Sequence, residues 1–442
     1  MLFRPARASD LDEVCALLAT ANEDAGHVRA LLLADPGFDP GQFRLAWTGG
    51  RIVACAKMYP RLLRMGSTTV AVGGIAHLYT DPSLRRQGLA STLLVECLTA
   101  MDQADLTLAI ITAPPRALYT RLGWQTLTET TLHLPPDALN CAPGSVESVE
   151  SVESVESAES VESAESAEIM GAAEGTATLF PTTGVSGNTP VSMPDTLRVR
   201  PIEERDLDGL LALHQAANCG RIGSVLHDAD GLTHHLAVLY LRGMTLLVAV
   251  EQTGAVVGFI AAQPLGKQVE VVELLLSSRT SQIWRALLCG VAAAAPDAVI
   301  MRCGLPADDR RVVRDALGRH VHVRERRDLL VRVVDPVRLL RCLAATLESR
   351  VLRAGLLADL TVRFGPLQGG VALRLHGASI SVTRPGPTDR YVVPESVFLA
   401  LLFGVEHARD DLDALALPGE VRHALGRLFP PQDWIFWRSE AF

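Results

Sequence analysis

A short motif occurs twice in the chain, at residues 4–12 and again at residues 200–208. Both copies read Arg-Pro followed by Asp-Leu-Asp, and a constant offset of 196 positions separates them. An apolar hairpin pattern with a glycine turn also recurs, at residues 43–59 and 246–262. Self-similarity of this kind indicates that the chain contains two copies of one structural unit.

Apolar alternation and spacing predict a mixture of strands and helices in each copy. In the first copy we expect strands at 3–7, 43–47, 52–59, 67–72, 75–80, 106–112 and from 124 to about 134, with helices after residue 9, within 22–40, from 89 and at 116–122. In the second copy we expect strands at 246–250, 256–262 and 269–276, and a helix at 283–295.

Residues 74–90 read as a buried strand, a turn and the start of a helix. Ile75–Thr80 is mostly apolar, β-branched or aromatic, Asp81-Pro82 ends the strand, and helical spacing begins at Leu89. The junction reads Arg-x-x-Gly-x-Ala, and its small residues let a ligand approach the backbone. Free N–H groups and the positive end of the helix dipole favour an anion there. The junction therefore predicts a phosphate site whose geometry suits a pyrophosphate.

The second copy has no such junction. Ser277–Gln282, which follows its corresponding strand, contains no glycine where the first copy has Gly88. We therefore expect the second copy to be a degenerate, structural duplicate.

The net charge of −9 comes largely from one low-complexity stretch. Residues 145–168 are eight Ser-(Val/Ala)-Glu triplets without Lys or Arg. Their period fits neither a helix face nor a strand, so we expect a disordered linker. The remainder is close to neutral, which disfavours binding to nucleic acid or to an anionic membrane.

The chain has no run of apolar residues long enough for a transmembrane helix and no signal-peptide pattern at its start. Its eight cysteines are scattered, without a Cys-x-x-Cys pair, which is typical of reduced thiols in a cytoplasmic protein. Adjacent His234 and His235 point to different faces and have no neighbouring cysteine or carboxylate cluster, so we expect no metal.

After residue 335 the pattern changes to a small α+β module. Helices are expected at 337–352, 394–403 and 420–428, with strands at 360–364, 371–375 and 380–383. The chain ends in an aromatic-rich tail, Trp434 to Phe442. Because aromatic side chains favour burial, we expect the tail to be docked on the rest of the molecule.

Arg85-x-x-Gly88-x-Ala90, followed about 30 residues later by Ala117–Trp124, resembles the acetyl-CoA and tyrosine motifs of the GNAT N-acetyltransferase superfamily. The whole arrangement resembles the enhanced intracellular survival (Eis) family. This resemblance implies an α/β fold with an α+β mixed sheet: two tandem GNAT-like domains plus a small α+β sterol-carrier-like C-terminal domain. The implied segments are a catalytic domain at 1–135, a linker at 136–196, a degenerate GNAT-like domain at 197–334, and a sterol-carrier-like domain with the docked tail at 335–442.

The resemblance also implies roles for individual residues. In that family the tyrosine matching Tyr119 is the general acid, and the terminal carboxylate of a phenylalanine matching Phe442 is the general base. Acetyl-CoA lies against the positions matching Leu78, Tyr79, Thr80, Arg85, Arg86, Gln87, Gly88, Leu89, Ala90 and Ser91. The implied reaction is acetyl transfer to a primary amine of a small polyamine or aminoglycoside-like molecule, or to a lysine side chain. The implied assembly is a homo-oligomer, with a hexamer as the candidate state.

Simpler interpretations remain open for several of these residues. Tyr119 could be a half-buried core tyrosine, the Phe442 tail could be docked without taking part in chemistry, and Arg85 could be a solvated arginine. His77 is better explained as a core or supporting residue than as a base. The alternative function is a non-catalytic acyl-CoA or lipid-binding sensor that uses the module after residue 335.

Overall fold

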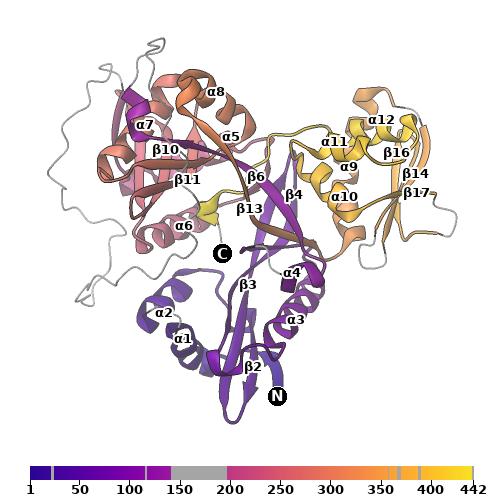
Figure 1. Ribbon diagram of the computed structural model, residues 1–442, viewed down its shortest axis with the longest axis horizontal. Coiled ribbons are helices and arrows are strands. Elements are labelled where there is room, and N and C mark those ends of the chain that lie inside the picture. The colour runs from indigo at the N-terminus through magenta and orange to yellow at the C-terminus, as the bar shows by residue number, and fades with distance from the viewer. Residues whose placement is uncertain are drawn as a thin grey trace.

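We analysed a computed structural model of the chain, which describes residues 1–20, 24–114, 117–140, 197–356, 358–365, 370–386 and 390–440. The predicted disorder of the triplet repeat falls outside these residues. Three parts are visible in Figure 1: a first half up to residue 140, a second half from 197 to 334, and a C-terminal part from 335.

The two halves present their elements in nearly the same order. The first half contains β1 (Leu2–Pro5), α1 (Leu11–Ala19), α2 (Ala25–Ala34), β2 (Phe43–Thr48), β3 (Arg51–Met65), β4 (Thr68–Thr80), α3 (Leu89–Gln103), β5 (Leu108–Thr112), α4 (Ala117–Arg121) and β6 (Gln125–Leu134). The second half contains β7 (Leu197–Pro201), α5 (Leu207–Ala217), β8 (Ile222–Val225), α6 (Ala229–Leu241), β9 (Thr245–Glu251), β10 (Val256–Leu265), β11 (Gln268–Leu276), α7 (Ser281–Ala294), β12 (Ile300–Gly304), α8 (Ala307–Leu317) and β13 (His322–Val333).

The repeated sequence motif is also a repeated set of contacts. Arg4 donates two hydrogen bonds to the carboxylate of Asp10, at 2.6 and 2.9 Å. Arg200 donates the same pair to Asp206, at 2.6 and 2.8 Å. Each aspartate also accepts the backbone amide three residues before it, and so fixes the turn that leads into the first helix of its half. The repeat in the sequence is therefore a repeat of local structure.

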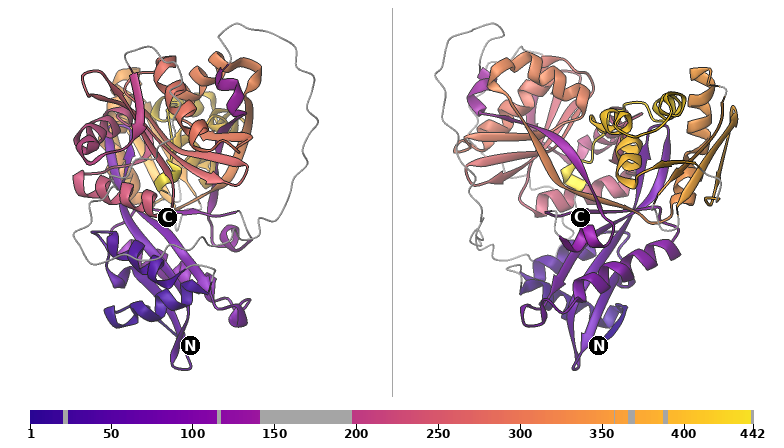
Figure 2. Two further views of the ribbon diagram at one scale, coloured as in Figure 1. Left: turned by 90° about the vertical axis from the view of Figure 1, so that its left-hand side faces the viewer. Right: turned by 45° about the vertical axis from the view of Figure 1, so that its right-hand side comes forward.

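The halves exchange their last strands. In the described residues, thirteen strands form one sheet in the order β1-β2-β3-β4-β5-β13-β6-β12-β11-β10-β9-β7, with β8 paired to β3. Leu329 of β13 lies opposite Thr112 of β5 and also opposite Leu127 of β6. Strand β6 of the first half in turn pairs with β12 of the second. Figures 1 and 2 show β6 and β13 as two long strands that run together through the centre of the molecule.

Helices cover both faces of the sheet in the first half. There, α1 and α2 lie on one side of β2–β4 and α3 on the other (Figure 1). The corresponding apolar clusters are separate, one under α1 and α2 and one under α3. The expected fold class, a mixed α/β arrangement, is confirmed.

The two strands predicted at 67–72 and 75–80 are in fact one, so that prediction was wrong. β4 runs without interruption through Gly73 and Gly74. A β-carbon at Gly73 would come within 2.4 Å of the terminal methyl carbon of Met101, because α3 packs directly on this part of β4. The glycine therefore allows close packing of helix on strand rather than a break in the strand.

The C-terminal part is a four-stranded sheet with helices packed on it. It contains α9 (Pro336–Ala354), β14 (Ala358–Phe364), β15 (Val371–Gly377), β16 (Ser379–Thr383), β17 (Tyr391–Val393), α10 (Glu395–Phe403), α11 (Ala408–Asp413) and α12 (Gly419–Leu428), with strand order β16-β15-β14-β17. The short β17 and α11 were not predicted. One apolar cluster joins this part to the large sheet, since Leu340 and Phe398 belong to the same core as Leu63 and Leu127.

Among the helices of the described residues, none combines the length and the apolar character needed to cross a membrane. All cysteines of the described residues are free thiols.

The strand exchange predicts that the two fragments produced by cleavage of the linker remain associated. A protease site replacing part of residues 145–168 should allow cleavage into two fragments that still elute together in size-exclusion chromatography under native conditions. They stay together because β13 is inserted between β5 and β6 and pairs with both. Fragments that separate without denaturant would contradict the exchange; the uncut chain is the control.

Candidate functional site

Strands β4 and β5 lie parallel for a short distance and then separate. Their pairing covers three residues of each strand, from Val72 to Gly74 in β4. β4 continues from there to Thr80, while the later part of β5 pairs with β13 alone among the described strands. Residues 75–80 of β4 are therefore left with one edge that no described strand covers.

A β-bulge interrupts β4 within this uncovered stretch. His77 has a φ of 50°, in the left-handed region that residues other than glycine rarely adopt. Opposite it, the register of β3 shifts between Cys55 and Lys57, so β4 contains one extra residue at this point. The bulge changes the direction of the strand immediately before the loop.

After the bulge, backbone groups of β4 point toward the uncovered edge. The amide of Asp81 donates to the carbonyl of Val53 in β3 at 2.9 Å. Because successive backbone groups alternate sides along a strand, those of Thr80 and Leu78 point away from β3. Consistently, the carbonyl of Thr80 accepts a hydrogen bond from the Nε of Arg85, at 3.2 Å, on the side away from β3. An extended ligand could therefore form strand-like hydrogen bonds with Leu78 and Thr80.

The loop between β4 and α3 has the form of an anion cradle. Arg86 has a φ of 64° and Gly88 a φ of 82°, and Gly88 is the N-cap of α3. A left-handed conformation costs a residue such as Arg86 about 1–2 kcal/mol, so the loop holds some strain. Backbone turns of this kind, at the start of a helix, direct several N–H groups toward one point. A β-carbon on Gly88 would meet nothing within 4 Å, so no protein group blocks the approach of a ligand to the loop at this residue.

The predicted cofactor residues are brought together around this cradle. Arg85, Arg86, Gln87 and Gly88 are exposed in the loop, Ala90 and Ser91 are half-buried in the first turn of α3, and Leu89 is buried. Leu78, Tyr79 and Thr80 are half-buried at the end of β4.

Asp81 fixes the start of the loop. Its carboxylate accepts the amide and the hydroxyl of Ser83, at 2.9 and 2.6 Å, and pairs with Arg51 at 2.6 Å. These contacts lower the pKa of Asp81 to about 2, the hydrogen bonds from Ser83 first and then Arg51. The carboxylate is therefore charged at neutral pH and holds the short turn Pro82–Leu84 in place.

The second half has no counterpart of the cradle. β11 ends at Leu276 and α7 begins at Ser281 after an N-cap at Thr280, which has an extended backbone. From Gly266 to Gly318, all of it in the described residues, no other residue has a positive φ. This backbone does not form the turns that gather N–H groups in the first half.

Tyr119 is held by a tight turn at the end of α4. Its carbonyl accepts the amides of Leu122 and Trp124, at 3.0 and 3.1 Å. Gly123, with a φ of 78°, makes the turn, and a β-carbon there would approach Arg332 to 3.2 Å. Tyr119 is 7% exposed, and its ring packs edge-on against Trp124, with ring centres 6.3 Å apart.

Tyr119 and the cradle share one apolar core. Leu89 and Leu93 of α3 belong to the cluster that contains Tyr119, and Leu78 packs against its margin. The core thus connects the loop, the uncovered end of β4 and the tyrosine. Phe442 lies outside the described residues, so its predicted position near this core stays a prediction.

The tail before Phe442 is fastened in the middle of the molecule. Trp437 is buried and its indole N–H donates to Asn218 at 3.0 Å. Arg438 is buried and donates to Glu129 of β6 and Asp328 of β13, the two exchanged strands. The short helix η7 (Arg438–Glu440) ends the described chain beside α6 and β11 (Figures 1 and 2). The described residues of the tail are therefore packed against strands of both halves and against α6 of the second half.

A buried lysine beside the bulge was not singled out from the sequence. Lys57 of β3 is 1% exposed, and its Nζ lies 3.7 Å from the ring centre of Tyr59. Burial lowers the pKa of Lys57 to about 7, although Asp35 opposes the change. His77 is hydrogen-bonded to the Tyr59 hydroxyl at 3.0 Å, and burial lowers its pKa to about 4. The available signal was a single charge inside the apolar run Ile52–Met58.

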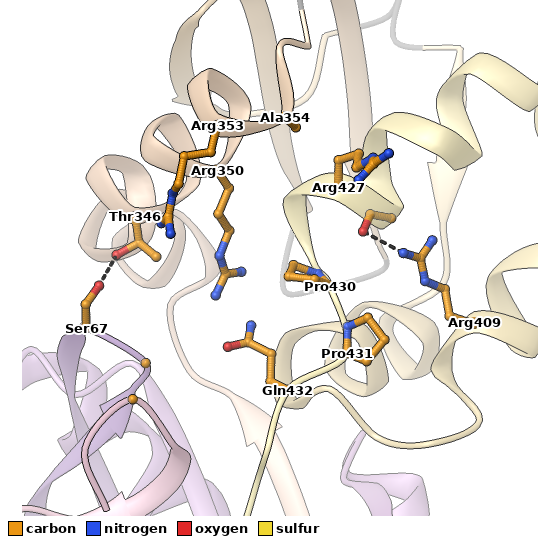
Figure 3. Close-up of a pocket in the computed structure, with 13 residues that line it drawn as sticks. Ser67, Thr346, Arg350, Arg353, Ala354, Arg409, Arg427, Pro430, Pro431 and Gln432 are labelled. Carbon is orange, nitrogen blue, oxygen red and sulfur yellow. Dashed lines mark hydrogen bonds between the residues drawn. The ribbon is translucent and has the colours of Figure 1, made fainter. Parts of the chain in front are cut away.

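A cavity of about 690 Å³ with an arginine-rich wall lies where the C-terminal part meets Gly66 and Ser67 of the β3–β4 turn (Figure 3). Arg350 and Arg353 enter from α9, Arg409 from α11 and Arg427 from α12. A wall of guanidinium groups suits an anionic group better than an apolar chain. Neither Tyr119 nor the cradle contributes to this cavity.

Comparison with known families identifies the part of the chain that carries the cradle. Residues 3–127 match the family model described as an acetyltransferase (GNAT) domain. That span includes β4, the loop, α3 and Tyr119. No curated protein matches the sequence of the chain.

Solved structures match the fold over nearly the whole chain. A GCN5-related N-acetyltransferase from Anabaena variabilis aligns with a TM-score of 0.65 at 12% identity, covering 98% of this chain and 99% of the other. One from Kribbella flavida gives a TM-score of 0.62 at 16% identity, covering 98% and 97%. Eis1 from Mycobacterium abscessus gives 0.61 at 15% identity, with 100% of both chains covered. At these identities the likeness shows the fold alone.

The burial of Lys57 predicts a pH-dependent stability. Its pKa is about 7 in the folded chain and near 10.5 when exposed, so the unfolded chain binds the extra proton between these values. The unfolding free energy should therefore rise with pH across this window, by at most about 5 kcal/mol, since each pKa unit corresponds to about 1.4 kcal/mol. Lys57→Met should abolish this rise in chemical denaturation at pH 7 and pH 10.

The matched control is Lys267→Met, since Lys267 is exposed and its replacement should leave the pH profile of the wild type intact. Equal pH profiles for Lys57→Met and the wild type would contradict the burial of a lysine whose pKa is lowered.

Proposed function

We propose, from the GNAT acetyltransferase domain at residues 3–127, that this protein transfers the acetyl group of acetyl-CoA to a primary amine. The observation that carries the proposal is the cradle formed by Arg86 and Gly88 beside the uncovered end of β4. The diphosphate of acetyl-CoA would bind the N–H groups of the loop and of the first turn of α3. Its extended arm would run along Leu78 and Thr80, which places the thioester toward the apolar core that contains Tyr119.

The reaction needs two proton transfers. A neutral amine attacks the thioester carbonyl, the new C–N bond forms, and the C–S bond breaks. Tyr119 would give its proton to the leaving thiolate. The terminal carboxylate of Phe442 would take the proton that the amine loses. A terminal carboxylate has a pKa of about 3.3–3.7 and becomes an effective base only when it is desolvated.

The acceptor in this proposal is a small polyamine or aminoglycoside-like amine, or a lysine side chain. A homo-oligomeric state and a cytoplasmic location belong to the same proposal, and light scattering on the purified chain would measure the former. The backbone of the second half, which lacks the turns of the cradle, leads us to propose one acetyl-CoA site in each chain.

The alternative is a sensor of acyl-CoA or lipid in the C-terminal part, and the arginine-rich cavity is its candidate site. The guanidinium groups there suit the phosphates of an acyl-CoA better than the chain of a neutral lipid. A sensor would bind acetyl-CoA in calorimetry without releasing free CoA in the presence of any amine, whereas the proposed enzyme releases CoA with at least one amine of a panel.

Gly88→Val should weaken acetyl-CoA binding at least about 10-fold in isothermal titration. A β-branched residue is strained at the φ of 82° that Gly88 adopts, and its side chain would block the approach to the N–H groups. Gly50→Val is the matched control, because Gly50 has a φ of 81° in the β2–β3 hairpin and is equally free of neighbours. Equal affinities for the two variants would rule out the cradle as the binding site.

Tyr119→Phe should lower kcat about 100-fold or more and change the KM for acetyl-CoA by less than about 3-fold, as expected for the loss of a general acid. A chain ending at Ala441 should also lose most activity, because its carboxylate is displaced. The assay is release of the CoA thiol with a panel of polyamines, aminoglycosides and lysine peptides. Full activity in both variants would contradict the mechanism.

A further inference from the structure

A second cluster of polar side chains is buried in the second half, away from the cradle. It contains three histidines and two glutamates: His214 of α5, His227 between β8 and α6, His235 of α6, Glu273 of β11 and Glu440 of η7. All five are buried. None of them has a role in the proposed acetyl transfer.

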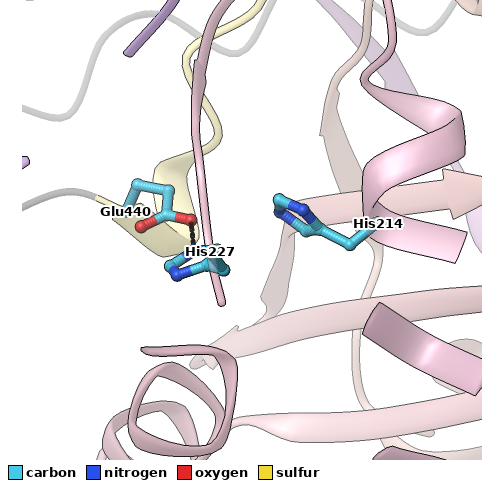
Figure 4. Close-up of side chains that lie close together, drawn as sticks. All are labelled: His214, His227 and Glu440. Atoms are coloured by element: carbon cyan, nitrogen blue, oxygen red, sulfur yellow. Dashed lines mark hydrogen bonds and ion pairs between the residues drawn. The ribbon is translucent and has the colours of Figure 1, made fainter. Parts of the chain in front are cut away.

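Three of these side chains converge on one point (Figure 4). His214, His227 and Glu440 each offer one ligand atom, and these atoms all lie within 4.8 Å of one another. The Oε1 of Glu440 lies 2.5 Å from the Nε2 of His227. Ligand atoms around a tetrahedral Zn²⁺ ion stand roughly 3.3 Å apart, given metal–ligand distances near 2.0–2.1 Å. Small side-chain shifts would therefore bring the three onto one ion.

The burial of His214 is not explained by hydrogen bonds to other described protein groups. It is 1% exposed, and neither of its ring nitrogens has a hydrogen-bond partner among the described residues. One oxygen of Glu273 is also buried without a hydrogen bond in this part of the chain, 3.7 Å from the Nε2 of His214. Buried polar atoms in folded proteins nearly always have partners, so these atoms indicate a missing one.

The charge of the cluster points the same way. Two buried carboxylates, Glu273 and Glu440, face the three buried histidines. A divalent cation would balance the charge of the two carboxylates in this buried place. His235, hydrogen-bonded to Glu273 at 3.2 Å, and Ser439, bonded to the same carboxylate at 2.7 Å, would orient the surrounding groups.

We propose that His214, His227 and Glu440 form a structural site for a divalent first-row transition metal ion that fastens the C-terminal tail to the second half. Two histidines and a carboxylate form a ligand set that Zn²⁺ and Fe²⁺ accept. The carboxylate of Glu273 lies 3.7 Å from the Nε2 of His214. The Nδ1 of His235 lies 3.7 Å from Glu440, so both residues border these three ligands. Because the ligands come from α5, the segment before α6 and η7, the ion closes a loop that spans about half of the chain.

The sequence predicted no metal, because the adjacent histidines His234 and His235 point to different faces and no cysteine or carboxylate cluster lies near them in sequence. Glu440 is far in sequence from the two proposed histidine ligands, and the three lack the short spacing of a metal-binding motif. Only the docking of the tail brings Glu440 to the histidines.

The test is metal binding to the full-length chain without a histidine tag. Elemental analysis of the purified protein should find about one equivalent of a divalent transition metal per chain. The chain stripped with a chelator should bind Zn²⁺ at one site and unfold at a higher temperature with Zn²⁺ than without it. Co²⁺ in the same site should give the intense visible absorption of tetrahedral coordination.

His214→Gln and Glu440→Gln should each weaken Zn²⁺ binding about 10-fold or more, whereas His322→Gln, which alters an exposed histidine of β13, should not. Circular dichroism checks that each variant is folded. Removal and rebinding of Zn²⁺ in the wild type tests the site even if a variant does not fold. The proposal is overturned if the purified chain holds no metal and the stripped chain shows no saturable Zn²⁺ binding, or if both ligand variants bind as the wild type does. None of these measurements depends on acetyltransferase activity, so their outcome is independent of the proposed function.

Discussion

The pairing of β13 with both β5 and β6 is the constraint on which the rest of the molecule depends. It inserts a strand of the second half into the sheet of the first and makes one continuous sheet. Glu129 of β6 and Asp328 of β13 meet at this crossing, and the buried Arg438 of the tail donates to both. A buried arginine deprived of such partners is strongly destabilising. The crossing therefore fixes the two halves and also the tail that follows the C-terminal part.

The two halves have diverged around the same framework. Each keeps the bidentate Arg–Asp pair at its start. Each also carries a polar side chain where the corresponding strand is irregular: His77 in β4 and, 196 positions later, Glu273 in β11. The first half keeps a strained loop open to ligands, whereas the second half, without such a loop, holds the tail against Glu273 through Ser439. One copy is thus suited to bind a ligand, the other to organise the end of the chain.

The sequence predicted the local features well because they depend on neighbouring residues. The repeat, the hairpins, the loop at Gly88 and the turn after Tyr119 could all be read from short patterns. The strand exchange could not, since β13 contains a charged run, residues 324–328, followed by an apolar run, residues 329–331, and neither run specifies the half with which the strand pairs. The position of Lys57 inside an apolar run was the one sign of its burial in the sequence. The contact of His214 with Glu440 depends on the docking of the distant C-terminal tail. Contacts between distant segments were the part that the sequence left undetermined.

We propose that one loop, in the first half alone, binds acetyl-CoA. Hydrogen–deuterium exchange with and without acetyl-CoA measures this directly, because ligand contacts slow the exchange of the amides involved. The account predicts that protection appears at residues 78–80 and 86–91 and is absent from residues 277–282 of the second half. Protection at 277–282, or none at 86–91 with saturating acetyl-CoA, would contradict it.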